Sequence, residues 1–495
     1  MLQLDGFSVE QAAFMFCAAA VQSGLIDEEE RAYCLNGVLD ILQLSAPQEA
    51  ASLLPLSRLG EFLVACAAEK GLCQDTEEAR ERFSVRLFGV VTPSPRAVRE
   101  GFARLLAEKG SQSATQWLHQ LGVNNEYIHT HRARENVSFI SQKGLEVLIS
   151  IYQKERDPKA THTRPRSAVG YPYCPLCREN VGYAGRQGYP ARQNLRQVPI
   201  TLGQESWYLQ YSPSPAFSQH CVALRGQHSP HLMVAKSFDK MLDFVDQFPH
   251  WFIGANADLP VVGGFILSHA HLIGGKHVFP VEQADAWFAF DPGVPGVTGE
   301  ALRWSITTLK LISKDRAPMM EALALLLARW RTHSDQSLGL VARTTVNHNA
   351  LTPMLRKTAK GYVCYVALRN NYATPEHPLG LFHPHARHHH IKRENIGLLE
   401  AMGLFVLPGR LKQELQAVER FLQGQEDLNW DDPHREWAEG LQQGLPESLD
   451  AAGVTQYVRQ AVGQVCEEAL QDAGVYKQNA QGEQGLQVFL AGLKA

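Results

Sequence analysis

The stretch that decides the fold of this 495-residue chain is Leu267-Ser268-His269-Ala270-His271-Leu272-Ile273-Gly274-Gly275. Residues two apart on an extended chain point to the same side, so the side chains of His269 and His271 can act together. A second glycine pair, Gly263-Gly264, precedes the stretch, and glycine lets the backbone approach a ligand closely. An H-x-H after an apolar strand, with glycine pairs on both sides, is typical of a phosphate-binding turn.

Short apolar runs bounded by Gly, Pro and Asn surround this stretch and alternate with helical periodicity. The runs predict strands over 207–211, 221–224, 261–267 and 362–368. The periodic segments predict helices over 238–248 and 320–330. This mixture predicts an α+β core rather than a purely helical or purely β protein.

Helical patterns dominate both ends of the chain. They predict helices over 12–23, 28–42, 58–70, 97–109, 410–422, 433–443 and 455–471. Ser94-Pro95 is typical of a helix start, with a serine cap followed by proline at the first helical position. A basic, turn-prone segment, 154–166, separates the first helices from the core. We therefore expect four regions: helical 1–160, core halves 161–285 and 286–410, and helical 411–495.

Composition mainly excludes classes of protein. A net charge of −4 and a pI near 6.6 argue against a dedicated nucleic-acid binder. The longest apolar runs reach about half of the roughly 18 residues that a membrane helix needs. Nine cysteines, an odd number, argue against a disulfide framework. The N-terminus lacks the basic region of a signal peptide. We expect a reduced, cytoplasmic protein without nucleic-acid or membrane partners.

Cys174-Pro175-Leu176-Cys177 is the second motif that carries chemistry. Two thiolates separated by two residues can bind one tetrahedral zinc ion, because the intervening turn points both sulfurs the same way. The residues that follow do not begin the helix that a thioredoxin-like pair requires. A metal site and two incidental cysteines remain the alternatives from this motif alone.

Histidine is the residue whose distribution is most uneven. Of 20 histidines, seven lie between residues 220 and 277, and six lie between residues 377 and 390. The second run includes His383-Pro384-His385, a rival to the first H-x-H, and is followed by Lys392 and Arg393. It can bind metal or phosphate, or form a solvated basic loop. The pattern of the segment from Thr345 to Arg356 fits sugar or phosphate binding and a surface turn equally well.

Taken in order, these segments resemble the type 2 galactose-1-phosphate uridylyltransferases. The resemblance runs through 171–183, 194–200, 208–213, 220–230, 248–280, 347–356 and 388–411, and covers most of the chain. It implies a histidine-triad-like core, an antiparallel sheet with helices, and helical segments at both ends. It also implies a ping-pong exchange in which UDP-glucose and galactose 1-phosphate become glucose 1-phosphate and UDP-galactose.

The resemblance assigns the chemistry to His271. The matching type 2 motif usually reads H-D-H-F-Q-G-G, so His271 is the expected nucleophile, which forms a uridylyl-histidine intermediate. Two positions depart from that motif, because Ala270 replaces the aspartate and Ile273 replaces the phosphate-binding glutamine. Isoleucine cannot donate a hydrogen bond, and losing one such donor costs on the order of 10²–10³ in rate in other enzymes.

The resemblance also implies a ligand set for a structural zinc ion and no organic cofactor. The implied ligands are Cys174, Cys177, His228 and His269, with His220 as an alternative to His228. The expected substrate-binding residues are Asn256, Asp258, Gly274, Gly275, Lys276, Asn347, Arg356, Lys392 and Arg393. The implied partners are nucleotide sugars, hexose 1-phosphates and a second copy of the chain in a homodimer.

Two other functions compete with this interpretation. A related nucleotidyl hydrolase or phosphorylase would resolve the same intermediate with water or inorganic phosphate. A homologue that binds UDP-sugars without turnover would be consistent with Ala270 and Ile273. UMP release without an acceptor would indicate the hydrolase, and binding without a covalent adduct would indicate the non-catalytic homologue.

Overall fold

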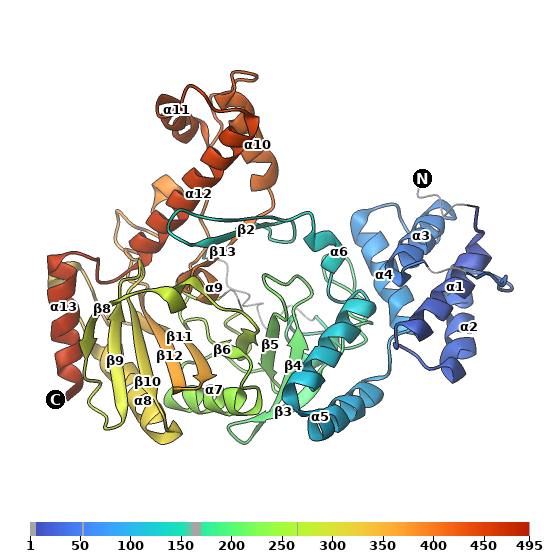
Figure 1. Ribbon diagram of the computed structural model, residues 1–495, viewed down its shortest axis with the longest axis horizontal. Helices are drawn as coiled ribbons and strands as arrows, with labels where there is room; N and C mark the ends of the chain where they lie inside the picture. The colour runs from blue at the N-terminus through green and yellow to red at the C-terminus, as the bar shows by residue number, and fades with distance from the viewer. Residues whose placement is uncertain (1–5, 52–53, 156–157, 160–169, 265, 495) are drawn as a thin grey trace.

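A ten-stranded antiparallel sheet forms the centre of the protein in the computed structural model, which describes residues 6–51, 54–155, 158–159, 170–264 and 266–494 (Figure 1). The strand order is β3-β4-β5-β7-β6-β11-β12-β10-β9-β8. The strands are β3 Val198–Leu202, β4 Glu205–Tyr211, β5 Cys221–Arg225, β6 Phe252–Gly254, β7 His271–Gly275, β8 Ala286–Phe290, β9 Val297–Leu302, β10 Thr308–Ser313, β11 Asn349–Thr358 and β12 Gly361–Asn370.

The two expected core halves contribute to this one sheet. Strands β3 to β7 come from the first half and β8 to β12 from the second, and they meet where β6 pairs with β11. The hydrogen-bonded register there places Ile253 opposite Leu355. The boundary expected near residue 160 lies outside the described residues.

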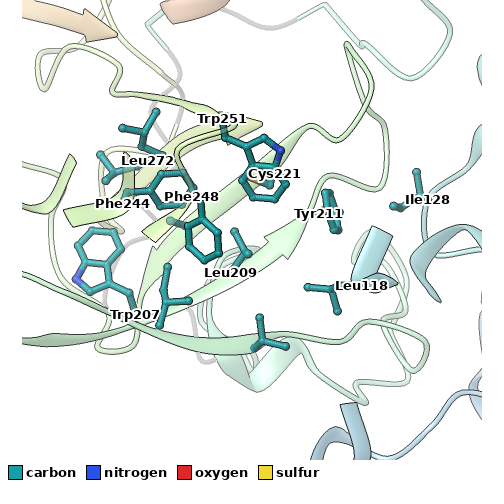
Figure 2. Packing of buried hydrophobic residues seen from close by; sticks show 14 of the residues in the cluster. Leu118, Ile128, Trp207, Leu209, Tyr211, Cys221, Phe244, Phe248, Trp251 and Leu272 are labelled. Carbon is teal, nitrogen blue, oxygen red and sulfur yellow. The ribbon is translucent and has the colours of Figure 1, made fainter. Parts of the chain in front are cut away.

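Two helices cover one face of the sheet. α7 (Ala235–Gln247) packs against β3, β6 and β11, and α8 (Arg316–Thr332) packs against β9 to β12. Figure 2 shows the part of this core beside α7, around the aromatic side chains of Phe244, Phe248 and Trp251. Burial of such large apolar side chains is the main favourable contribution to folding. It anchors the strands that carry the site.

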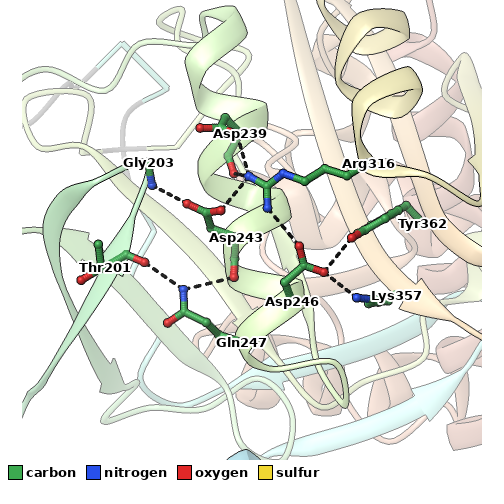
Figure 3. A network of polar contacts seen from close by, with 9 residues as sticks. All are labelled: Thr201, Gly203, Asp239, Asp243, Asp246, Gln247, Arg316, Lys357 and Tyr362. Carbon is green, nitrogen blue, oxygen red and sulfur yellow. Dashed lines mark hydrogen bonds and ion pairs between the residues drawn. The ribbon is translucent and has the colours of Figure 1, made fainter.

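A network of charged groups joins the two halves at the edge of these helices (Figure 3). Arg316, at the start of α8, lies 2.6 Å from both Asp239 and Asp243 and 2.9 Å from Asp246, all on α7. Asp246 also accepts a hydrogen bond from Lys357 of β11 at 2.6 Å. Because these groups are partly exposed, water and salt screen each pair, and the network mainly sets the register of α7 against α8.

A smaller sheet and the C-terminal helices cover the other face. The small sheet has the order β1-β2-β13, with β1 Val137–Ile140, β2 Glu146–Ser150 and β13 Leu404–Pro408. It packs with α9 (Leu398–Ala401), α10 (Leu411–Leu422) and α12 (Ala451–Ala473) in a second apolar cluster. The N-terminal region, predicted to be helical, ends in the β1–β2 hairpin, where the sequence predicted no strand. Its strands complete a sheet with a partner more than 250 residues away.

The remaining helices lie at the two ends of the chain (Figure 1). They are α1 Val9–Gln22, α2 Arg31–Leu42, α3 Leu56–Glu69, α4 Glu77–Val90, α5 Pro95–Asn124, α6 Thr130–Ala133, α11 Arg435–Gln443 and α13 Ala480–Ala491. The helix start predicted at Ser94-Pro95 is confirmed, because the Ser94 hydroxyl accepts a hydrogen bond from the N–H of Ala97 at 3.2 Å. Among the described residues, none of the helices has the length and apolar character needed to cross a membrane.

One strand prediction near the site is wrong. The segment 261–267 does not form a strand in its described part. Val261 has a φ of +71°, a left-handed value unsuited to a strand. A single bridge between Ala257 and Gly263 closes the loop instead. His271 therefore begins a strand, β7, rather than following one. The overall α+β class, with an antiparallel sheet and helices, is confirmed.

Candidate active site and metal centre

Four side chains from three separate segments of the chain meet beside strands β5 and β7. Cys174, Cys177, His228 and His269 have ligating atoms that all lie within 4.8 Å of one another. The Sγ atoms of the two cysteines are 3.5 Å apart. Nδ1 of His269 lies 3.2 Å from Sγ of Cys174, and Nδ1 of His228 lies 3.3 Å from Sγ of Cys177. The structure thus brings together all four expected ligands.

The spacing of these atoms fits a tetrahedral divalent ion. Zinc binds sulfur at about 2.3 Å and imidazole nitrogen at about 2.0 Å, which separates ligand atoms at a tetrahedral site by roughly 3.3–3.8 Å. His269 donates its Nε2 hydrogen to the carbonyl of Arg225 at 2.8 Å, which leaves the Nδ1 lone pair for the ion. Asn180 donates to the carbonyls of Cys174 and Cys177 and so holds the turn between the thiols.

One sulfur of the cluster is prepared to bind a cation. The hydrogen bond from Cys174, together with the rings of His269 and His228, lowers the pKa of Cys177 against the opposing effect of burial. A thiolate is the form that binds a metal ion. His220, the alternative ligand, stacks on Phe217 outside the cluster, with ring centroids 4.6 Å apart.

His271 follows the metal cluster by two residues and begins β7. Its Nδ1 lies 2.8 Å from the carbonyl oxygen of His269. Because a carbonyl can only accept, Nδ1 carries the hydrogen and Nε2 keeps a free lone pair. Burial, and then the nearby ring of His231, lower the pKa of His271 to about 3, so the imidazole is neutral. A neutral imidazole with a free, oriented nitrogen is a nucleophile.

A cavity of about 370 Å³ opens beside His271 on the sheet face away from α7. This size suits part of a small organic ligand. Of the expected substrate-binding residues, Asn256 and Lys392 line the cavity. The side-chain oxygen of Asn256 accepts a hydrogen bond from the N–H of Leu398 at 2.8 Å, which leaves its NH₂ group as a donor.

Lys392 lies in a buried group of charges at one end of this cavity. Its Nζ is 3.3 Å from Oε1 of Glu400 and 3.9 Å from Oε2 of Glu394. Burial opposes the positive charge, but Glu400 and then Glu394 outweigh it and raise the pKa of Lys392. The guanidinium of Arg369, which is 1% exposed, interacts electrostatically with Glu400 and donates a hydrogen bond to the carbonyl of Ile396 at 2.8 Å.

The two departures from the expected motif lie on opposite faces of the sheet. Ile273 lines the cavity with His271, because residues two apart on β7 share a face. Its side chain therefore stands where a donor to the substrate is expected. Ala270 lines a smaller cavity of about 140 Å³ with Trp207, Leu272 and His271, so His271 borders both cavities. The Ala270 departure thus lies away from the larger cavity, whereas the Ile273 departure lies within it.

Gly274 and Gly275 are required by packing within the sheet. A Cβ on Gly274 would lie 2.9 Å from the carbonyl oxygen of Phe252. Gly275 has a φ of +136°, and a Cβ there would lie 2.1 Å from the carbonyl oxygen of Gln219. Neither glycine lines the cavity. Close approach of neighbouring chain segments therefore requires glycine at both positions. Contact of this pair with a ligand stays a prediction.

Two other expected substrate-binding residues are engaged in ion pairs. Asp258 lies 2.7 Å from Arg331 and accepts a hydrogen bond from the N–H of Met233. Arg356 lies 2.9 Å from Glu282 and donates to a backbone carbonyl. Neither residue lines the cavity. Both groups hold loops against the sheet, a role for which the sequence offered no signal because each partner is more than 70 residues away.

The last three expected substrate-binding residues are exposed. Lys276 leaves the end of β7 near His250, and Asn347 belongs to a turn before β11. Arg393 lines a broad groove of the surface instead of the cavity. The side chain of the adjacent Lys392 is buried in the cavity wall, so one of these two neighbouring basic residues is buried and the other is exposed.

The second histidine-rich segment is bonded within the protein. His383 lies 3.1 Å from the carbonyl of Pro384 through Nδ1 and 3.4 Å from the Asn395 side chain through Nε2. His385 and His388 each lie 3.4 Å from a carboxylate oxygen of Asp472, on α12. None of these three histidines lines the cavity beside His271. The interpretation of His383-Pro384-His385 as a decoy is consistent with this position.

Sequence reasoning missed several residues of the cavity wall. Glu394 and Glu400 line it, as do Ser212, Ser214 and His220. Glu394 follows Lys392 by two residues in a segment that composition presented as basic. The alternation of charged residues with Ile391 and Ile396, both fully buried, was the available signal that this segment enters the interior.

Comparisons with known proteins agree on one family. Residues 51–230 match the family profile described as galactose-1-phosphate uridyl transferase, N-terminal domain. The chain is 36% identical to the galactose-1-phosphate uridylyltransferase of Caldanaerobacter subterraneus, over 96% of each chain. It is 38% identical to that of Pediococcus pentosaceus, over 94% of this chain and 96% of the relative. It is 37% identical to that of Bacillus subtilis, over 95% of each.

Similarity to solved structures is much weaker. Yeast Ap4A phosphorylase Apa2 aligns with a TM-score of 0.31 and 12% identity, over 69% of this chain and 90% of that one. The near full-length relatives therefore carry the family assignment.

Proposed function

The chain belongs to the galactose-1-phosphate uridylyltransferase family, and on that premise we propose that it transfers a uridylyl group from UDP-glucose to galactose 1-phosphate through His271. The observation that carries the proposal is the orientation of His271. Its Nδ1 donates to the carbonyl of His269, and its ring lines the 370 Å³ cavity. Nε2 is thereby the nitrogen available to a substrate.

The first half-reaction forms a covalent intermediate. Nε2 of His271 attacks the α-phosphorus of UDP-glucose, a P–N bond forms, and the P–O bond to glucose 1-phosphate breaks with its electron pair. The hydrogen on Nδ1 stays in its bond to the His269 carbonyl, which stabilises the positive charge that the ring acquires. No proton transfer to the leaving group is needed, because a phosphate monoester leaves as an anion.

The second half-reaction reverses these events with a different acceptor. A phosphate oxygen of galactose 1-phosphate attacks the uridylyl phosphorus, the P–N bond breaks, and UDP-galactose leaves neutral His271 behind. Positioning dominates such phosphoryl-group chemistry. The amide of Asn256 is a neutral donor in the cavity wall. Ile273 supplies none, so this chain lacks one donor that the family motif provides.

The proposed metal ion has a structural role. Cys174, Cys177, His228 and His269 would hold zinc, which when bound supplies a rigid cross-link between the loop before β7 and the rest of the core. His269 links this centre to the nucleophile, since its ring is a ligand and its carbonyl orients His271. The ion would thus support the geometry of the site without contacting the reacting phosphorus.

Mass spectrometry of the intact protein tests the covalent step. After mixing with UDP-glucose alone, the wild-type chain is expected to gain one uridylyl group. The adduct is expected to be absent in His271→Ala and present in His385→Ala, and addition of galactose 1-phosphate should remove it as UDP-galactose. An adduct that survives in His271→Ala and disappears in His385→Ala would refute the assignment.

A further inference from the structure

His220 brings a hydrogen-bond donor to the cavity that contains His271. Its side chain is partly buried and lines the cavity. The backbone N–H of Ala216 donates to Nδ1 of His220 at 3.3 Å. Because Nδ1 accepts this bond, the hydrogen of the neutral ring lies on Nε2, which has no partner among the residues that the structure describes. The Nε2–H group is therefore available to a ligand.

The ring of His220 has a fixed orientation and is uncharged near pH 7. It stacks on Phe217, with ring centroids 4.6 Å apart. Burial, and then the nearby ring of His277, lower the pKa of His220 to about 4. A neutral imidazole donates through one nitrogen only, and here that nitrogen is Nε2. A donor that is already oriented needs no reorganisation when charge develops on a substrate.

Strand pairing places His220 beside Ile273. Val222 of β5 lies directly opposite Ile273 of β7, and both line the cavity. His220 precedes Val222 by two residues and lies on the same face. Such diagonal neighbours are roughly 7–8 Å apart, within reach of a long side chain. Ile273 occupies the position of the phosphate-binding glutamine in the family motif, so the donor of His220 lies next to that position.

Other donors in the cavity wall are already engaged. Nζ of Lys392 pairs with two buried carboxylates. The hydroxyl of Ser212 and the amide of Asn395 each donate to a backbone carbonyl. The Nε2–H group of His220 has no such bond, so it can donate to a substrate without giving up a partner in the protein.

We propose that His220 is a further catalytic residue, whose Nε2–H donates a hydrogen bond to the uridylyl phosphoryl group from the position beside Ile273. The inference rests on the proposed function, in which Nε2 of His271 attacks that phosphorus. As the P–N bond forms and the P–O bond breaks, the hydrogen bond stabilises charge on a non-bridging oxygen. The hydrogen stays on His220 throughout. This donor makes up part of what the chain lacks at Ile273.

Single-turnover uridylylation at saturating UDP-glucose tests the proposal on the full chain. His220→Phe keeps an aromatic ring beside Phe217 but removes the N–H, and is expected to lower the rate by about 10²- to 10³-fold. His220→Gln, whose amide nitrogen can replace Nε2, is expected to retain more of the rate. His220→Asn keeps an acceptor for the N–H of Ala216 but is too short to replace Nε2. It should lose rate as His220→Phe does, which keeps the test decisive if His220→Phe does not fold.

A double-mutant cycle with Ile273→Gln separates a donor from a structural support. The new amide would donate to the same phosphoryl group, so His220→Phe is expected to cost about tenfold less in the Ile273→Gln background than in the wild type. His277→Phe is the matched control. Its ring also stacks on Phe217, with centroids 5.0 Å apart, but does not line the cavity. This variant should keep the rate within about threefold.

Equal losses from His220→Phe in the two backgrounds would overturn the proposal, because His220 would then support the structure or contact another part of the substrate. An unchanged rate at saturation would also overturn it, whether or not the affinity for UDP-glucose falls. Failure of the uridylyl-transfer function is distinguishable, since it would appear as a missing covalent adduct in the wild-type chain itself.

Discussion

The two histidine-rich segments, 220–277 and 377–390, differ in what their ring nitrogens contact. In the first segment, His269 and His271 each use one nitrogen to bond a backbone carbonyl and keep the other for a ligand or substrate. In the second, both nitrogens of His383 and of His385 have protein partners. A dense run of imidazoles is therefore not a site by itself. Free, oriented lone pairs distinguish His269 and His271 from His383 and His385.

The largest effect on catalysis should come from replacing one histidine by glutamine in each segment and comparing the two variants. His271→Gln is expected to lower kcat by on the order of 10⁴- to 10⁶-fold, because it removes the nucleophile. His385→Gln should retain kcat within about threefold, since His385 contacts only protein groups. Steady-state rates of UDP-galactose formation measure both. Equal losses in the two variants would erase the distinction between the segments.

Removal of a metal ligand should have the next largest effect. Cys177→Ala is expected to lose the bound metal ion and to lower the free energy of unfolding by on the order of 5 kcal/mol. Elemental analysis and denaturant titration measure these quantities. His388→Ala is the matched change in the second segment and should leave the metal content unchanged. A full complement of metal in Cys177→Ala would contradict the proposed centre.

The third largest effect should come from adding a hydrogen-bond donor beside His271 in the first segment. Ile273→Gln is expected to raise kcat by about 10²-fold, because the new amide would face the cavity beside His271 and donate to the phosphoryl group. Single-turnover rates with UDP-glucose measure this step directly. Ile312→Gln, a change of the same kind on β10 outside the cavity, is the control. An unchanged rate in Ile273→Gln would show that other donors already meet the need.

The smallest effect should come from the anchor of the second segment. Asp472 bonds to His388, His385 and Arg387; although burial opposes its charge, these partners lower its pKa. Its contribution to stability is therefore present above the unfolded-state pKa of about 3.9 and lost as the pH falls through the lower, folded-state value. Asp472→Asn should reduce the free energy of unfolding at pH 7 by about 1–3 kcal/mol.

Chemical denaturation at a series of pH values checks that last expectation. The difference between wild type and Asp472→Asn should shrink as the pH falls below about 4. Catalysis should be nearly unaffected at pH 7, because Asp472 lies outside the cavity. If Asp472→Asn lowered kcat more than the control variant Ile312→Gln does, the second histidine-rich segment would contribute to catalysis, contrary to this expectation.

Much of the fold was predictable from local patterns. Most helices at both ends, the Ser94 cap and the strands at β4, β5 and β12 follow from residue periodicity and capping chemistry, which depend on neighbours within a few residues. The helices α4 and α13 were not predicted. The hairpin β1–β2 and the loop around Val261 were not predicted. Their conformations depend on β13 and on the bridge to Ala257, which no local pattern reveals.

The candidate site divides in the same way. The residue types, the C-x-x-C and H-x-H spacings and the resemblance to a family could be read from the chain, and they identified Cys174, Cys177, His269 and His271. The expectation that Lys276, Arg356 and Arg393 contact substrate depended on their positive charge and on their place in segments that carry the family resemblance. Their actual surroundings depend on distant partners or on exposure.

The sequence by itself determined which chemical groups this protein has and which of them are neighbours along the chain. Only the tertiary structure decided which of them lie together. His228, rather than His220, lies beside the two cysteines. Lys392 lines the cavity while its neighbour Arg393 does not, and the carboxylate of Glu394 is buried without a hydrogen-bond partner among the described residues. The physical reason is that a ligand's surroundings are set by contacts across 50 to 100 residues of chain, such as the 95 residues between Cys174 and His269. Periodicity and composition describe surroundings only over a few residues.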